Sequence, residues 1–167
     1  MPQSVTGAVY ADGAKYCFSG AVWGGWDLNG SKIKCMLLKK AYFDGNGGNH
    51  SGPAQDTEVY TDVQAFEISN SGTNYTAGGV AMNTNSISVT SAGNITKLIA
   101  GTTTFPLITY SDVRGCCIYS ISPADANVKK VLGYIDFLSN AGDTYSPSAQ
   151  DIVITWDATG AMQLIYV

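Results

Sequence analysis

VLGYIDFLSNAGDTYSPSAQDIVITWDATGAMQLIYV, residues 131–167, is the stretch that decides the fold of this chain. It holds three runs rich in β-branched and aromatic residues, and polar segments rich in Gly, Ser, Asn and Asp separate them. Runs of this kind, bounded by turn-forming residues, are typical of strands in a sheet. The stretch therefore predicts three strands and a β-rich protein.

The last two runs alternate between the two faces of a strand. In residues 152–156, and again in residues 162–166, every second side chain is large and apolar, which predicts that one face of each strand is buried. The DATG sequence at 157–160 has the length of a short loop, and Gly160 permits the positive φ that such loops commonly need. We expect the two strands to pair as a hairpin.

More strands are expected upstream, and long helices are not. We expect a short helix within residues 8–20, one helical turn within residues 57–67, and strands at residues 33–38, 86–90, 105–110, 115–121 and 131–138. Residues 91–101 fit either a strand or a helical turn. Consecutive strands without long helices between them favour antiparallel pairing. The predicted fold class is mainly β: an antiparallel β-sandwich with one or two short helices, formed by residues 1–167 as a single domain.

The composition excludes some classes of partner. The net charge is −4 and the pI is about 4.7, so a polyanionic partner such as a nucleic acid is not expected. No uninterrupted apolar run approaches the roughly 18 residues of a membrane-spanning helix. Only 13% of the residues are charged, about half of the usual quarter. The surface is therefore expected either to be neutral, or to be covered by a partner.

The four cysteines show no metal-binding or disulfide pattern. Cys17, Cys35, Cys116 and Cys117 lack the Cys-x-x-Cys spacing, and a bridge between the adjacent pair would be strained. The first sixteen residues lack a basic segment followed by an apolar run, so we expect no secretory signal. Free, buried thiols in a reducing compartment are the interpretation that fits both observations.

No catalytic or metal-binding motif is predicted. His50 lies in a loop rich in Gly and Asn with no acid or nucleophile assigned to it, and the oxygen-bearing residues of residues 44–55 fail the EF-hand template at Gly48 and Gln55. Asp136 lies between two apolar residues of an expected strand and is interpreted as pointing outward. We therefore expect no enzyme activity, no metal and no cofactor.

Aromatic residues are the candidate interface residues. Trp23 and Trp26 flank two glycines, and Tyr42 follows an expected strand. Indoles in such a segment either pin a loop over a core, contact another subunit, or stack on sugar rings, and we favour the first two interpretations. If the chain binds another protein, Trp23, Trp26 and Tyr42 are the predicted anchors.

Several blocks carry a resemblance to a known family. The blocks are WDLNGSKIKCMLL at 26–38, YTAGGV at 75–80, RGCCIY at 114–119, and VLGYIDF with DIVITWDATGAMQLIYV in residues 131–167. Together they resemble the small β-rich virion proteins that are encoded among the head and tail genes of tailed bacteriophages. The Gly- and Asn-rich segment at 44–53 and the polar segment at 91–104 depart from that pattern.

The resemblance implies a structural subunit of the virion. The role that we favour is capsid cement or decoration: a protein on the outer capsid surface that stabilises the phage head by binding the assembled shell. The implied partners are the major capsid protein and other copies of this chain, as a homo-oligomer. The alternative is a tail or fibre component with a β domain that contacts glycans. The resemblance assigns no catalytic or ligand-binding residue.

Overall fold

The structure is a computed structural model. It describes whole residues in 32–43, 60–82, 101–122, 126–138 and 143–156, and the backbone of strands at 6–9, 86–90, 95–99 and 162–165. The described part of the chain is mainly β with two short helices, and all described strand pairs are antiparallel. The predicted fold class is thus confirmed.

The described helices are α2 (Lys40–Phe43) and α3 (Tyr60–Gln64). The described strands are β1 (Thr6–Val9), β2 (Ile33–Lys39), β3 (Val80–Ala81), β4 (Ser86–Thr90), β5 (Ile95–Ile99), β6 (Thr103–Ile108), β7 (Val113–Ile121), β8 (Lys129–Asp136), β9 (Gln150–Ile154) and β10 (Met162–Ile165). The strands expected upstream of residue 139 and the helical turn within 57–67 are confirmed, and residues 95–99 form a strand.

The largest sheet is centred on β7. It has five strands in the order β1-β8-β7-β2-β3. Residues 113–119 of β7 are all buried, which is possible because their sequence, VRGCCIY, is apolar at nearly every position and therefore suits a strand that is covered on both faces.

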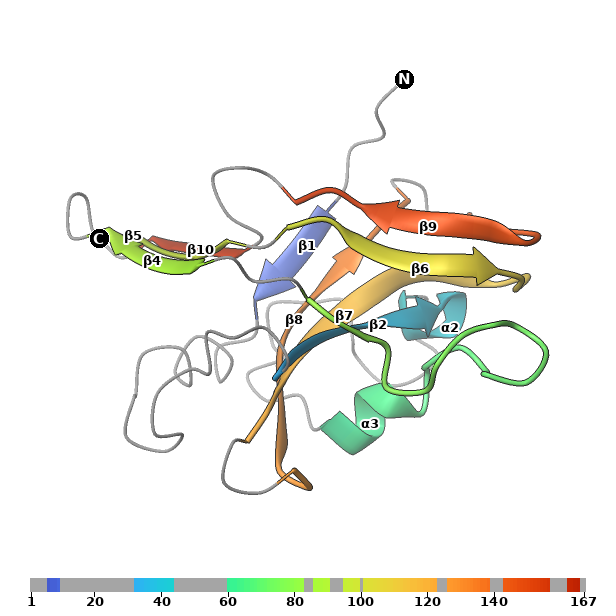
Figure 1. Cartoon of the computed structure of the whole chain (residues 1–167), viewed down its shortest axis with the longest axis horizontal. Helices are drawn as coiled ribbons and strands as arrows, with labels where there is room; N and C mark the ends of the chain where they lie inside the picture. Colours follow the sequence, from blue (N-terminus) through green and yellow to red (C-terminus); the bar gives the residue numbers. More distant parts are fainter. Residues whose placement is uncertain are drawn as a thin grey trace.

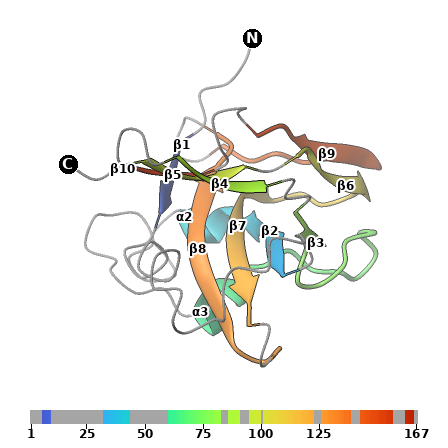
Figure 2. The ribbon, with the colours of Figure 1, turned by 60° about the vertical axis from the view of Figure 1, so that its left-hand side comes forward.

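Two separate clusters of apolar side chains cover the two faces of this sheet. The side chains of β2 alternate between the two clusters: Ile33, Cys35 and Leu37 join one, and Met36 and Leu38 join the other. The first cluster contains side chains of β6 and β9, and the second contains side chains of α2 and α3. Figures 1 and 2 show the β6–β9 pair on one side of β7 and the two helices on the other.

The β6–β9 pair is a two-stranded ribbon. Phe105 pairs with Ile152 across it, and both side chains are buried against the five-stranded sheet. Trp156, two residues after β9, is also buried, and its indole Nε1 donates a hydrogen bond to Thr103 Oγ1 at 2.8 Å. The predicted alternation of residues 152–156 is confirmed, because Val153 and Thr155 are exposed.

Two local predictions need correction. The predicted hairpin between residues 152–156 and 162–166 is wrong, since β9 pairs with β6 and β10 pairs with β5 in a separate sheet of order β10-β5-β4. The alternation of a strand specifies its buried face and leaves its partner open. The start of the helix predicted within residues 8–20 is also wrong, because Ala8 and Val9 belong to β1, which pairs with β8. The rest of that segment lies outside the described residues.

Two glycines allow a close approach of backbones. Gly79 has a φ of +67°, and a Cβ atom there would overlap the carbonyl oxygen of Cys35 in β2. Gly115 lies under the aromatic ring of Phe43, and a Cβ atom there would overlap both that ring and the carbonyl oxygen of Ile135. The adjacent Gly78 also has a positive φ, +83°, so that the backbone bends at these two glycines.

We expect Gly79→Ala to lower the free energy of unfolding by at least 3 kcal/mol, roughly the sum of left-handed strain and steric overlap. Gly72→Ala is the matched control, because Gly72 has nearly the same φ, +69°, but nothing within 4 Å of an added Cβ. That variant should lose only about 1 kcal/mol. Urea unfolding measures both changes, and equal losses would contradict the steric role of Gly79.

Candidate functional site

The structure describes one of the three predicted interface residues. Trp23 and Trp26 lie outside the described residues, and so do His50 and the whole segment 44–53. The glycan-contacting alternative depends on the two tryptophans and therefore stays a prediction. Tyr42 is described, and it lies inside the protein.

Tyr42 packs inside the second apolar cluster, with 0% of its surface exposed. Its ring makes edge-on contacts with Phe43, Phe66 and Tyr134, at centroid distances of 5.1, 5.8 and 5.9 Å. An anchor for a partner has to be accessible before binding. The position of Tyr42 is therefore explained by packing of α2 under the sheet, and its side chain is not at the surface in this structure.

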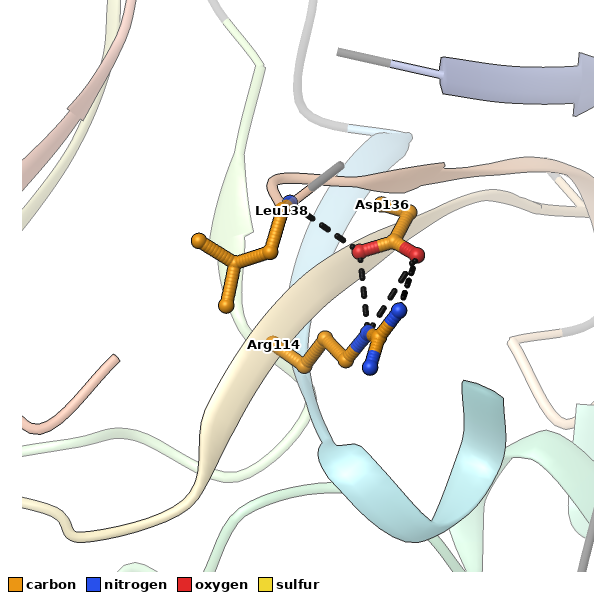
Figure 3. Close-up of polar contacts among 3 residues, drawn as sticks. All are labelled: Arg114, Asp136 and Leu138. Atoms are coloured by element: carbon orange, nitrogen blue, oxygen red, sulfur yellow. Dashed lines mark hydrogen bonds and ion pairs between the residues drawn. The ribbon is translucent and has the colours of Figure 1, made fainter. Parts of the chain in front are cut away.

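The side chain of Asp136 points toward the protein interior. The prediction that it points outward is therefore wrong. Its carboxylate accepts hydrogen bonds from Arg114 Nε at 3.1 and 3.2 Å and from Arg114 Nη2 at 2.9 Å (Figure 3). The Leu138 backbone N–H donates a further bond of 3.1 Å to Oδ1. The two side chains are only 6% and 13% exposed. A two-pronged ion pair of this kind is strong and directional, and it joins β7 to the end of β8.

A buried carboxylate lies at the edge of the five-stranded sheet. Glu67 is 8% exposed, and its Oε1 accepts hydrogen bonds from the Tyr75 hydroxyl at 2.7 Å and from the Gly78 N–H at 2.5 Å. The Tyr75 oxygen in turn accepts a bond from the Leu37 N–H in β2 at 3.2 Å. These bonds satisfy groups that would be costly to bury alone. They tie residues 67–78 to β2.

The polar contacts continue to the helix side of the sheet. The Tyr119 hydroxyl donates a 2.6 Å hydrogen bond to the Gly78 carbonyl, and its ring packs on Tyr60 of α3 with the centroids 4.8 Å apart. Lys129 Nζ lies 4.3 Å from the centre of the Tyr60 ring and 3.3 Å from its hydroxyl. Every step of this series connects two elements of the fold, so we assign it a structural role.

Burial keeps several of these groups protonated. It raises the pKa of the Tyr75 hydroxyl well above its ordinary value, and the negative charge of Glu67 raises that pKa further. Burial and the neighbouring Tyr60 raise the pKa of Tyr119. Burial and then a hydrogen bond with Cys116 raise the pKa of the Cys35 thiol. A group held in its neutral form at neutral pH is a poor nucleophile or base.

The described cysteines fit the sequence-based interpretation. Cys35, Cys116 and Cys117 are free thiols and buried; Cys17 lies outside the described residues. Within the residues that the structure describes, no three His, Cys, Asp or Glu side chains are grouped to hold a metal ion. Among those same residues, no helix has the length and apolar character needed to cross a membrane.

A corner of the β6–β9 ribbon carries backbone strain. Leu107 and Ala149 both have a φ of +49°, and Asn74 in the adjacent loop has a φ of +57°. Left-handed conformations are rare for leucine and alanine, and strain of this kind is concentrated at functional positions. The three residues are the described non-glycine residues with positive φ.

Side chains of the same corner hold Leu107 in place. The Asp151 carboxylate accepts a 2.9 Å hydrogen bond from the Leu107 N–H, and Asn74 Nδ2 donates a 3.3 Å bond to the Leu107 carbonyl. The Thr109 hydroxyl accepts a 2.8 Å bond from the Ala149 N–H. The corner is therefore fixed by contacts from three segments of the chain.

The strained corner places apolar side chains in solvent. Leu107 is 53% exposed and Val153, on the outer face of β9, is 55% exposed. They are the two most exposed large apolar side chains of the described residues. A strained backbone that presents a leucine to water gains nothing for folding from that side chain, so we take the corner, defined by Asn74, Leu107, Ala149 and Asp151, as the candidate functional site.

The chain was also compared with known proteins. No family model, no curated protein and no solved structure matches it.

We expect Tyr75→Phe to lower the free energy of unfolding by about 2 to 4 kcal/mol, because it removes one of the two hydrogen bonds to the buried Glu67 carboxylate and leaves the buried Leu37 N–H without its acceptor. Tyr145→Phe is the matched control, since the Tyr145 hydroxyl bonds to Gln150 on the exposed surface. It should change stability by less than about 0.5 kcal/mol. Chemical denaturation measures both values, and a small loss in Tyr75→Phe would contradict the proposed role of the network.

Stability should fall in alkaline solution. The unfolded chain releases protons from Cys near pH 8.5 and from Tyr near pH 10, whereas the raised pKa values of Cys35 and Tyr75 keep these groups protonated in the folded chain. The contribution of each group to the free energy of unfolding is complete below the pKa of the unfolded chain. Above that pKa, the free energy of unfolding falls by about 1.4 kcal/mol per pH unit for each group. Urea titrations under reducing conditions between pH 8 and 11 measure this fall. The Tyr75→Phe variant should show a shallower fall above pH 10; an identical slope would argue against the raised pKa of Tyr75.

Proposed function

We propose that this chain is a viral structural protein, a capsid cement subunit that binds the assembled shell of a tailed bacteriophage and stabilises the head. The resemblance of its strand blocks to small phage virion proteins suggests the class of protein. The observation that suggests which surface would bind the shell is the exposed Leu107. Hydrogen bonds with Asp151 and Asn74 hold this residue in a left-handed conformation.

A cement protein acts through binding free energy alone. A subunit that binds the assembled shell and not its free components shifts the equilibrium toward the shell. For this it needs a rigid surface with an apolar anchor, because an anchor that is already fixed loses little conformational entropy on binding. The hydrogen bonds at both peptide groups of Leu107 supply that rigidity, and about half of its side chain is available for burial.

The polar groups of the interior are consistent with this proposal. The carboxylates of Glu67 and Asp136 are occupied by hydrogen bonds that connect strands and loops. The Cys35 thiol and the Tyr75 and Tyr119 hydroxyls, whose pKa values are raised by burial, are buried and protonated. These groups stabilise the scaffold on which the corner lies, and the proposed function requires no chemical reaction at any of them.

The test measures binding of the purified chain to capsids from which the native copies of this protein have been removed. We expect Leu107→Asn to weaken binding about 5- to 10-fold, because burial of half a leucine side chain contributes roughly 1 kcal/mol. Asparagine tolerates a positive φ better than leucine does, so the variant should fold at least as stably as the parent chain. Co-sedimentation over a range of concentrations gives the affinity, and thermal unfolding checks the fold.

Val128→Asn is the matched control for this experiment. Val128 is also a large exposed apolar residue, at 41%, but it lies in the turn before β8. It should bind capsids as the parent chain does. Failure of the parent chain to bind capsids that lack this protein would refute the proposed function. Equal losses of affinity in both variants would refute the role of Leu107.

A further inference from the structure

The second edge of β9 lies at the margin of the molecule. Within the described part of the chain, β6 is the strand that pairs with β9, and both views show β9 on the far side of β6 from β7 (Figures 1 and 2). Asp151, Val153 and Thr155 are exposed along it. An accessible strand edge presents backbone N–H and C=O groups that can pair with a further strand.

The sequence of this edge is complementary to itself in one antiparallel register. If two copies of β9 pair about a two-fold axis through Val153, Ile152 of one copy lies opposite Ile154 of the other. Asp151 then lies opposite Thr155 in both halves of the pair. A threonine hydroxyl can donate to a carboxylate, and Asp151 has acceptor capacity beyond its one bond from the Leu107 N–H.

Two other registers that involve Asp151 are less favourable. An axis through Asp151 would place the two carboxylates directly opposite each other, which is destabilising. An axis through Ile152 would place each carboxylate opposite Val153. The axis through Val153 avoids both arrangements and brings together the most exposed apolar side chain of the ribbon and its own copy.

We propose that two copies of this chain associate through the edge of β9, in antiparallel register about a two-fold axis at Val153. The two ribbons then form one four-stranded sheet in the order β6-β9-β9-β6. This contact is isologous, so that it closes on itself and makes a dimer rather than a filament. Leu107 itself stays outside the new strand pair, because it belongs to β6, whereas Asp151 of the same corner belongs to β9 and takes part in the pair.

The dimer should be weak. An edge of five residues buries much less than the roughly 1,200 to 2,000 Å² of a standard stable interface. We therefore expect concentration-dependent association, with monomer and dimer in exchange. Sedimentation equilibrium of the unmodified chain measures this directly. A chain that stays monomeric up to several hundred micromolar would overturn the proposal.

Cysteine cross-linking tests the register. In the proposed dimer the two copies of residue 153 face each other with Cβ atoms about 4.5 to 5.5 Å apart, so Val153→Cys should form a disulfide-linked dimer under mild oxidation. The two copies of residue 155 are separated by four residue steps, about 13 Å, which is beyond the reach of a disulfide. Thr155→Cys is therefore the matched control, since both positions are exposed.

We expect Val153→Cys to cross-link at least tenfold faster than Thr155→Cys on non-reducing gels. The unmodified chain, oxidised in parallel, gives the background from its own cysteines. Equal rates, or a faster rate for Thr155→Cys, would overturn the proposed register. The sedimentation and cross-linking measurements need no capsid. A negative result for the dimer would therefore leave the capsid-binding test of Leu107 unaffected, and a negative result for capsid binding would leave the dimer proposal unaffected.

Discussion

Burial of both faces of β7 is the constraint on which the rest of the structure depends. A strand with seven consecutive buried residues needs a cover on each side, because an uncovered face would leave several apolar side chains in water. The β6–β9 ribbon covers one face, and α2 and α3 cover the other. Short helices are sufficient here because Tyr42, Tyr60 and Val63 bring large side chains under the sheet.

Covering the sheet on both sides leaves polar groups in the interior, and hydrogen bonds compensate for their burial. Arg114 is the one charged residue in the buried run of β7, and its pairing with Asp136 keeps the ion pair near the end of β8. Glu67 and Tyr75 do the same at the β2 edge. Because removal of one partner leaves the other buried and unpaired, these contacts also fix which loops lie against the sheet.

The sequence could predict the strands but not their partners. Alternation is a local property, and in residues 152–156 it predicted one buried face, the face on which Ile152 and Trp156 lie. Pairing is non-local: residues 131–167 resemble successive strands of one sheet, yet β8, β9 and β10 belong to three different sheets. Asp136 was interpreted as outward-facing because alternation takes no account of an arginine 22 residues earlier in the chain.

The Leu107 corner shows why the candidate site left no signal in the sequence. Glycine commonly adopts a positive φ, so the glycines at 72, 78 and 79 indicate such positions in the sequence. A leucine or an alanine in the same conformation gives no such indication. Each such residue costs about 1 to 2 kcal/mol, and the opposing contacts come from residues far along the chain, Asn74 and Asp151. Asn74 is held in turn by its neighbour Tyr75, which bonds to Glu67 and stacks on Phe105. The same buried network that closes the sheet edge therefore supports the strained surface above it, so that loss of the network should disturb the corner even though no side chain of the corner is removed.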